Sequence, residues 1–449
     1  MKSFDLIVIG AGTAATSAAN RCASAGWSVA VIDELPYGGT CALRGCDPKK
    51  MLRRGAELVD AVHLMQGKGV ETACLRINWA DLMAFKRTFT DKMPGRVESG
   101  LQKSGVETFH GTARFISPNS IEVDDAQLEG RYMLIATGAR PRDLSMPGAE
   151  LMIDSTQFLE LEALPKRILF VGGGFISFEF AHIAARARSD VCVLDHSSRP
   201  LSTFDPDLVD TLIQRTERIG VEFCPQTDVQ SIKEVGAGFE VSATKDGNKE
   251  TWSTDLVVHG AGRVAALDRL NLRAANVEFS DKGVSVNEYL QSVSNSSIYA
   301  AGDASDTDGW PLTPVSFHEG KIAASNMLKG NKKTADYRGI PTAVFTIPEL
   351  TRVGLLESEA EEQGIDFRTK FTDTGTWYSN MRVGEDCAAV KVLIDNQTDE
   401  ILGAHLFGPE YSELVNIFGL AIKFGLKTGD LKRMVSAYPS VGSDLGSLV

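Results

Sequence analysis

Two cysteines, Cys41 and Cys46, lie five residues apart in a glycine-rich stretch, residues 38–50, near the start of the chain. The stretch leads into a predicted helix. At this spacing two thiols can close a small ring, so the pattern indicates a redox-active disulfide. A reactive thiol also has to be held partly as thiolate, and its surroundings decide whether it is.

The charges around the two thiols support this prediction. Arg44, Lys49 and Lys50 surround them, and positive charge together with the start of a helix favours a thiolate. Asp47 opposes that effect. A metal site is the competing interpretation, but it requires further ligands, and His63, the nearest histidine, falls on a helical stretch. We therefore predict no metal site here.

The chain has seven cysteines, an odd and sparse number that argues against a secreted disulfide framework. The other five stand alone in the sequence among apolar or mixed neighbours. We expect these to be buried and inert thiols: Cys22, Cys74, Cys192, Cys224 and Cys387.

The elements that would position the thiols begin at the N-terminus. A strand at 5–9 leads into a glycine-rich turn at 10–15, then a helix, then a strand at 28–32 that ends at Asp33. This order is typical of a dinucleotide-binding fold.

Each position of this turn has a physical role. Gly10 permits the tight turn, Gly12 lets backbone N–H groups approach a pyrophosphate, and Ala15 lets the helix pack closely on the sheet. The helix N-terminus favours the negative charge. Asp33, with Glu34 as the weaker candidate, is predicted to accept hydrogen bonds from a ribose.

A second copy of the pattern lies in the middle of the chain. A strand at 168–171 precedes Gly172 and Gly174, and a strand at 191–194 ends at Asp195. The same number of residues separates Gly12 from Asp33 and Gly174 from Asp195. Two complete copies predict two bound dinucleotides.

Which nicotinamide the second copy binds is left open by the sequence. Asp195 favours a free ribose diol and so NADH, whereas His196 and Arg199 are placed to meet the 2′-phosphate of NADPH. We lean slightly to NADH.

Two further strands, each ending in small residues, resemble the rest of a flavin site. One contains Thr137 and Gly138, and the other contains Gly302 and Asp303, which is placed to bind a ribityl hydroxyl. Because the second of them follows the second dinucleotide pattern, the second sheet is inserted into the first domain.

The predicted fold class is α/β: two Rossmann-like doubly wound dinucleotide-binding domains plus a C-terminal α+β dimerisation domain. We expect antiparallel strands at 342–346 and 388–394 and helices at 358–363 and 410–424. The predicted domains are a first dinucleotide-binding domain at 1–149 and 264–333, a second at 150–263, and a C-terminal interface domain at 334–449.

Composition excludes several classes of function. Hydrophobic residues make up 43% and charged residues 23% of the 449 residues, as in an ordinary globular protein. The formal charge of −13 makes nucleic acid an unlikely partner. No apolar run approaches a membrane span, and no targeting segment is evident. With redox-active thiols, this predicts a cytoplasmic protein.

Taken together, these motifs resemble the flavoprotein disulfide reductase family, the class I pyridine nucleotide-disulfide oxidoreductases, over essentially the whole chain. The resemblance implies FAD at the first dinucleotide motif, NAD(P)H at the second, a homodimer, and a small-molecule electron acceptor. The cysteine loop, including Gly39 and Thr40, and the Pro341–Thr346 segment also match.

The resemblance also implies roles for single residues. Cys46 corresponds to the thiol that lies against the flavin and Cys41 to the thiol that attacks substrate. Glu179 corresponds to the partner of a lysine near the flavin, either Lys49 or Lys50. The remaining two assignments concern the nicotinamide: Phe175 stands where many relatives have a gating tyrosine, with core packing as its alternative, and Gly262-Arg263 resembles a nicotinamide-domain arginine motif.

The C-terminal segment departs from the family. Relatives carry a His that protonates the leaving thiol and a Glu that orients it; here Tyr438 and Ser443 stand in those places, with Asp444 one position later. A positioned general acid contributes about 10²–10⁴ in rate. Tyrosine, with a reference pKa of about 10, can donate a proton but is a poor base.

Three hypotheses follow. In the first, electrons pass from NAD(P)H through FAD to the Cys41–Cys46 disulfide and on to a disulfide or other acceptor. In the second, flavin reduces a metal, quinone or oxygen directly, with weak disulfide reduction. In the third, the protein is a flavin-binding sensor with negligible turnover.

Overall fold

The computed structural model describes all of residues 1–449. Its residues group into two compact units, each built from three segments of the chain. The first unit contains residues 1–49, 84–142 and 262–337, and the second contains residues 50–83, 143–261 and 338–449.

The first unit is built on a seven-stranded sheet in the order β3-β2-β1-β6-β5-β4, with β18 also paired to β6. The strands β1, β2, β3, β6 and β18 run parallel, and β4 and β5 complete an antiparallel edge. The strands are β1 Lys2–Ile9, β2 Val29–Asp33, β3 Glu107–His110, β4 Ala113–Ser117, β5 Ser120–Val123, β6 Ala126–Ile135 and β18 Ile298–Ala300.

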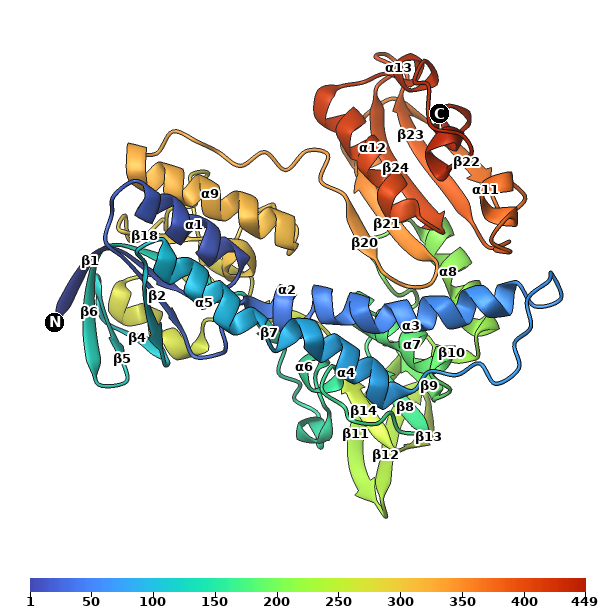
Figure 1. Ribbon diagram of the computed structural model, residues 1–449, viewed down its shortest axis with the longest axis horizontal. Helices are drawn as coiled ribbons and strands as arrows, with labels where there is room; N and C mark the ends of the chain where they lie inside the picture. The colour runs from blue at the N-terminus through green and yellow to red at the C-terminus, as the bar shows by residue number, and fades with distance from the viewer. The chain divides into compact units, whose positions relative to one another are not determined.

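Helices pack on this sheet because its strands are apolar on both faces. The helix α1 runs beside α9, which comes from a distant part of the sequence (Figure 1). Small residues of α1, such as Ala15 and Ala18, are fully buried and allow this close packing. The helices are α1 Thr13–Ser24, α2 Gly39–Arg44, α5 Met93–Lys103 and α9 Thr313–Lys329.

Short strands complete the first unit. They form one two-stranded and one three-stranded sheet. Their bounds are β7 Ala139–Pro141, β15 Arg263–Ala265, β16 Phe279–Ser280, β17 Gly283–Ser285 and β19 Ser305–Asp306.

The second unit contains a parallel four-stranded sheet in the order β10-β9-β8-β14 and a three-stranded antiparallel sheet, β11-β12-β13. Helices α7 and α8 pack on the parallel strands. The bounds are β8 Arg167–Val171, β9 Asp190–Leu194, β10 Val221–Cys224, β11 Thr227–Val235, β12 Gly238–Lys245, β13 Asn248–Thr254, β14 Leu256–His259, α6 Ser155–Phe158, α7 Phe175–Arg186 and α8 Pro206–Arg218.

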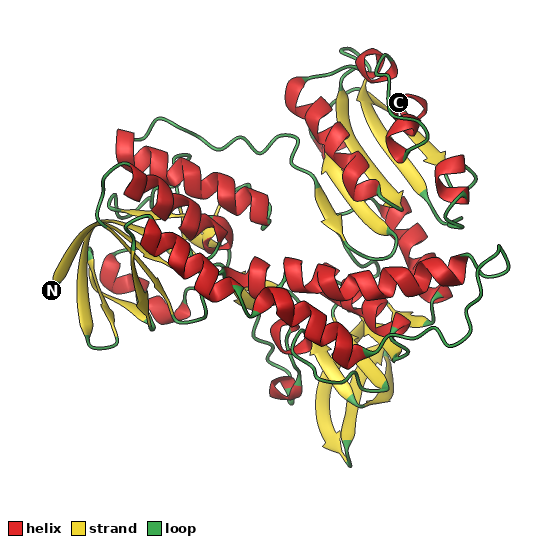
Figure 2. Cartoon of the chain, viewed as in Figure 1, coloured by secondary structure: helices red, strands yellow, loops and turns green.

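The C-terminal part of the second unit is a five-stranded antiparallel sheet, β20-β21-β24-β23-β22, with α12 packed on β21 and β24 (Figure 2). The bounds are β20 Thr342–Val344, β21 Glu349–Gly354, β22 Phe367–Asp373, β23 Ala389–Asp395, β24 Ile401–Gly408, α10 Glu357–Glu362, α11 Tyr378–Met381, α12 Tyr411–Phe424, α13 Thr428–Lys432 and α14 Leu445–Leu448. The helices α3 Cys46–Leu64 and α4 Trp79–Thr90 each contribute residues to both units.

The predicted fold class is confirmed. Both dinucleotide-type sheets form, β18 returns to the first sheet after the second one, and the C-terminal part is α+β. The domain boundaries stay predictions. None of the helices combines the length and apolar character needed to cross a membrane.

The prediction of five isolated, buried cysteines is partly wrong. Cys22, Cys224 and Cys387 are buried, but Cys74 is exposed and Cys192 is only partly buried. Cys192 and Cys224 are also neighbours on adjacent strands, because β9 and β10 pair in the sheet.

Candidate active site

The turn after β1 is closed so tightly that two of its positions require glycine. Gly10 has φ +108°, and a Cβ there would lie 2.3 Å from the carbonyl oxygen of Ala136. Gly39 has φ +68°, and its Cβ would lie 2.5 Å from the Cα of Gly12. The backbone of the cysteine loop therefore lies in contact with the dinucleotide turn. Side chains at Gly10 or Gly39 would fill the space between these backbone segments.

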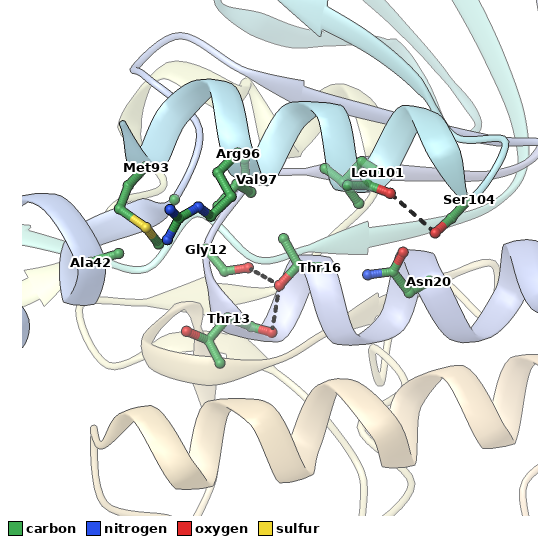
Figure 3. Close-up of a pocket in the computed structure, with 13 residues that line it drawn as sticks. Gly12, Thr13, Thr16, Asn20, Ala42, Met93, Arg96, Val97, Leu101 and Ser104 are labelled. Carbon is green, nitrogen blue, oxygen red and sulfur yellow. Dashed lines mark hydrogen bonds between the residues drawn. The ribbon is translucent and has the colours of Figure 1, made fainter. Parts of the chain in front are cut away.

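A cavity of about 510 Å³ opens beside this turn. It is lined by residues of the turn, of α1 and of α5, including Gly12, Thr13 and Arg96 (Figure 3). The first N–H groups of α1 have no side-chain cap. A helix N-terminus together with an arginine suits a phosphate group.

Asp33 fastens the end of β2 to the turn. One carboxylate oxygen accepts the N–H of Ala11 at 2.7 Å and the other accepts that of Leu35 at 2.8 Å. Burial raises the pKa of Asp33, and these two hydrogen bonds counteract the rise. Each oxygen keeps a lone pair for a ribose hydroxyl. Glu34 is exposed and pairs with Arg269 at 2.7 Å, so Asp33 is the better placed of the two.

The segments predicted to hold the flavin lie in the same unit. The hydroxyl of Thr137 is buried without a hydrogen-bond partner, and Gly138 has φ +71°. Burial raises the pKa of Asp303, and the charge of Arg263 opposes the rise. An orphaned hydroxyl and a buried carboxylate both fit a polar cofactor in this position. The site therefore fits FAD.

The loop that carries Asp303 is held by a glutamate that sequence reasoning missed. Glu319 of α9 is 1% exposed and accepts the N–H of Gly302 at 2.6 Å. It also accepts the hydroxyls of Thr307 and Tyr337 at 2.8 and 2.7 Å. Only the tertiary fold brings these residues together, because they come from different segments.

The structure brings the two thiols of the cysteine loop together. Cys41 lies on α2, and Cys46 is the first residue of α3, so only the Gly45 connection separates them. Both are free thiols here. Hydrogen bonding with Cys46, followed by burial, raises the pKa of Cys41, and the negative charge of Asp47 adds to the rise.

A threonine that sequence reasoning also missed contacts the pair. Thr313 is the first residue of α9, and its hydroxyl lies 3.7 Å from the sulfur of Cys46. Its hydrogen bond to Cys41 lowers the pKa of that thiol. Cys46 thus lies at the start of its own helix and beside the start of α9, and both dipoles favour negative charge on its sulfur. The sequence signal that could have pointed to Thr313 is the Leu-Thr-Pro helix start that follows Gly302-Asp303.

The second glycine-rich turn repeats the geometry of the first. Gly172 has φ +101°, and its Cβ would lie 2.7 Å from the backbone of Gly260. A Cβ on Gly173 would lie 2.3 Å from a carboxylate oxygen of Asp195. The acid at the end of β9 therefore packs against the turn, as the motif predicts.

The groups around Asp195 differ in how they are engaged. Asp195 is 4% exposed and accepts the hydroxyl of Ser197 at 2.5 Å. His196 is exposed and lies 3.4 Å from Asp195. Arg199 pairs with Asp210 at 3.3 Å. The carboxylate of Asp195 is thus buried at the centre of this group, and the nearby arginine is paired with another acid.

Glu179, on α7, is buried at 2% exposure and accepts the N–H of Phe345 at 2.7 Å. Lys50 lies over the ring of Phe345, 3.8 Å from its centroid. The side chain of Lys49 is buried, whereas Lys50 is exposed. The pairing of Glu179 with either lysine stays a prediction.

Two more predicted cofactor residues are placed plainly by the structure. Phe175 begins α7 and is 49% exposed, which argues against simple core packing. Arg263 follows Gly262, begins β15 and donates to the carbonyl oxygen of Ala139 in the first unit. Its nicotinamide role stays a prediction.

The C-terminal segment does not rebuild a His–Glu pair. Tyr438 is 83% exposed. Ser443 donates its hydroxyl to the carbonyl oxygen of Ser440 at 2.5 Å, and Asp444 accepts the hydroxyl of Ser379. Both residues near the expected glutamate position are therefore engaged elsewhere.

Comparisons with known proteins show the family to which the chain belongs. The sequence profile of the pyridine nucleotide-disulphide oxidoreductase family matches residues 4–320, and that of its dimerisation domain matches residues 340–448. The chain therefore belongs to the pyridine nucleotide-disulphide oxidoreductase family.

Several relatives extend over nearly the whole chain. Glutathione reductase of Nostoc sp. is 32% identical over 97% of both chains. Mercuric reductase of Lysinibacillus sphaericus is 30% identical over 99% of this chain and 81% of that protein. The Cu(II) complex of the HOCl-induced flavoprotein disulfide reductase RclA from Escherichia coli has a TM-score of 0.89 and 26% identity, covering 100% of this chain and 99% of that one.

Membership makes the protein an NAD(P)H-dependent flavoprotein oxidoreductase that acts on a sulfur group. The family uses FAD and NAD(P)H, and FAD supplies a two-electron carrier between the nicotinamide and the dithiol. In this chain, the residues of the first turn and of the flavin segments described above would hold FAD. The Cys41–Cys46 disulfide takes up two electrons and two protons and becomes the dithiol.

Proposed function

We propose that the dithiol of this protein passes its electrons to a redox-active metal ion, with Cu(II) as the probe, and that NADH is the donor. Reduction of two Cu(II) ions converts the dithiol to the disulfide, yields two Cu(I) ions and releases two protons. The step needs no proton donor.

The observation that supports this acceptor is the C-terminal segment. A disulfide acceptor produces a leaving thiolate that has to be protonated, and a positioned acid contributes about 10²–10⁴ to that step. Tyr438 stands at the place of the acid, with neither Ser443 nor Asp444 free to orient it. Reduction of a metal ion does not require this acid, so it is not impaired by the loss of the His–Glu pair.

Relatives provide independent support. One group of relatives is named mercuric reductase, and the matching RclA structures include a Cu(II) complex. The relatives named glutathione reductase make a disulfide the second candidate acceptor.

NADH is proposed as the donor because of the groups around Asp195. The buried carboxylate can accept both hydroxyls of a ribose, whereas it would repel a 2′-phosphate. Arg199, the cation that could offset this, is held by Asp210.

We also propose that the protein acts as a homodimer in the cytoplasm. The dimerisation-domain match covers residues 340–448, and large apolar side chains of this part are exposed, among them Val435 at 97% and Phe424 at 70%. A partner subunit would cover them. The cytoplasmic location is proposed because a dithiol of this kind has to be kept reduced.

The test is a steady-state screen of acceptors with NADH. We expect Cu(II) to be reduced much faster than glutathione disulfide by the wild type. The double variant Tyr438→His/Ser443→Glu should gain disulfide reduction by about tenfold or more and leave Cu(II) reduction unchanged.

The variant Cys41→Ser/Cys46→Ser is the control for the route. It should lose Cu(II) reduction if the dithiol carries the electrons, and it should keep it if flavin reduces the metal directly. Wild-type disulfide reduction as fast as that of Cu(II) would contradict the proposed acceptor.

A further inference from the structure

Three potential metal ligands meet on the second parallel sheet, away from the Cys41–Cys46 pair in sequence. Cys192 of β9 and Glu222 of β10 are direct partners across the two strands. Cys224 follows two residues after Glu222 and so lies on the same face of the sheet. One ligand atom from each of the three lies within 4.8 Å of the other two.

The three residues of this cluster differ in their exposure to solvent. Cys224 is 3% exposed, Cys192 is partly buried and Glu222 is exposed. The two sulfurs lie within 4.8 Å of each other, and the sulfur of Cys224 lies 3.4 Å from a carboxylate oxygen of Glu222. The soft ligands therefore face the apolar layer between the two sheets, and the carboxylate marks an entry from solvent.

Charge around the cluster suits a bound cation. Two thiolates and a carboxylate would place three negative charges in one small volume, which is costly unless a cation joins them. Lys245, at the end of β12, offers partial compensation.

A disulfide is the other product two neighbouring cysteines can give, and the register argues against it. Cys224 pairs with Leu194, not with Cys192, so the two cysteines are diagonal neighbours on adjacent strands. The strand spacing and rise put diagonal Cα atoms about 8 Å apart, whereas a disulfide needs about 4.4–6.8 Å. Metal coordination allows a longer separation of the two residues than a disulfide does. Two ligand sulfurs, each about 2.3 Å from one ion, lie nearly 4 Å apart.

We propose that Cys192, Cys224 and Glu222 form a binding site for one thiophilic divalent metal ion of the zinc class. The ion takes two sulfur ligands and one oxygen ligand and leaves a fourth position open to water. This replaces the expectation that both cysteines are inert, and it does not depend on the acceptor proposed above.

The site is next to Asp195, the predicted ribose-binding acid, and is joined to it by a backbone hydrogen bond. The backbone N–H of Asp195 donates to the carbonyl oxygen of Cys224 at 2.9 Å. An ion bound to Cys192 and Cys224 therefore joins the two strands whose ends position Asp195.

The test uses the oxidised holoenzyme, in which the Cys41–Cys46 disulfide cannot bind a metal. Cd(II) is titrated while its ultraviolet thiolate charge-transfer band is followed, and Zn(II) is added in competition. We expect saturation at one Cd(II) per chain and displacement by Zn(II). Each of Cys192→Ser and Cys224→Ser should weaken binding by about tenfold or more, since even outer-shell partners of a metal are worth about 10–100-fold.

Two further variants keep the test decisive. Cys74→Ser removes an exposed lone cysteine and should leave the Cd(II) titration unchanged. Glu222→Gln alters only an exposed side chain, so it should fold even if the cysteine variants do not, and it should weaken Cd(II) binding with unchanged FAD content. The proposal is overturned if Cd(II) does not bind, or if Cys192→Ser, Cys224→Ser and Glu222→Gln all bind it as the wild type does. It is also overturned if Cys192 and Cys224 form a disulfide with each other.

Discussion

Gly39 provides a direct test of the cofactor cradle. Replacement by alanine places a Cβ 2.5 Å from the Cα of Gly12, in a backbone conformation with φ +68°. The left-handed conformation costs about 1–2 kcal/mol for an L-residue, and forcing atoms into a packed site costs about 1–3 kcal/mol more. The atom in the way is backbone, so it cannot rotate aside.

The cost should appear mainly in FAD binding. Without the cofactor the cysteine loop can move away from the turn, whereas the cofactor requires both to be in place. A total of about 2–5 kcal/mol corresponds to about 30- to 4000-fold weaker binding. The measurement is the dissociation constant of FAD for the apoprotein, from quenching of flavin fluorescence.

Gly26→Ala is the matched control. Gly26 also has a left-handed backbone, with φ +89°, but its Cβ would meet nothing within 4 Å. This variant should lose some stability and keep its affinity for FAD. If the apoprotein of Gly39→Ala binds FAD within about threefold of Gly26→Ala, the close contact between the two loops does not shape the cofactor site.

Three further predictions follow from other parts of the structure. Asp47→Asn removes a negative charge that helps to raise the pKa of Cys41, so alkylation of Cys41 in the reduced enzyme should reach its half-maximal rate at lower pH than in the wild type; an unchanged or higher midpoint would contradict this. Asp195→Asn should lower the ratio of kcat/KM for NADH to that for NADPH by about tenfold or more, because a hydrogen bond to a charged group is worth about 1.5–3 kcal/mol; a constant ratio with a dye acceptor would refute the role of this acid. Asp60→Asn should destabilise the protein by about 3–5 kcal/mol, because Asp60 joins the buried Arg186 and Arg215 at 2.7 and 3.0 Å; a change below about 1 kcal/mol in urea unfolding would show that these arginines find other partners.

The parts of the fold that repeat a local rule could be predicted from the sequence. The spacing from Gly12 to Asp33, repeated from Gly174 to Asp195, predicted two strand–turn–helix–strand units, and both are present. The cysteine loop could be predicted as well, because both thiols lie within one short segment. In each case the signal needs only residues that are near in sequence.

The contacts that cross the fold could not be predicted in the same way. Glu319 meets Gly302 because α9 packs against the turn at Gly302–Ala304, and Thr313 meets Cys46 across more than two hundred residues of chain. The closeness of Cys192 and Cys224 depends on the pairing of β9 with β10. A pattern read along the chain treats such residues as isolated.

The most direct test of the account is to follow where the electrons of NADH arrive. Oxidised enzyme is mixed anaerobically with one equivalent of NADH, and thiols are then alkylated and located by mass spectrometry. We expect two new thiols per chain, at Cys41 and Cys46, with none gained in Cys46→Ser. Consumption of NADH without new thiols at these two positions would contradict the claim that the dithiol carries the electrons.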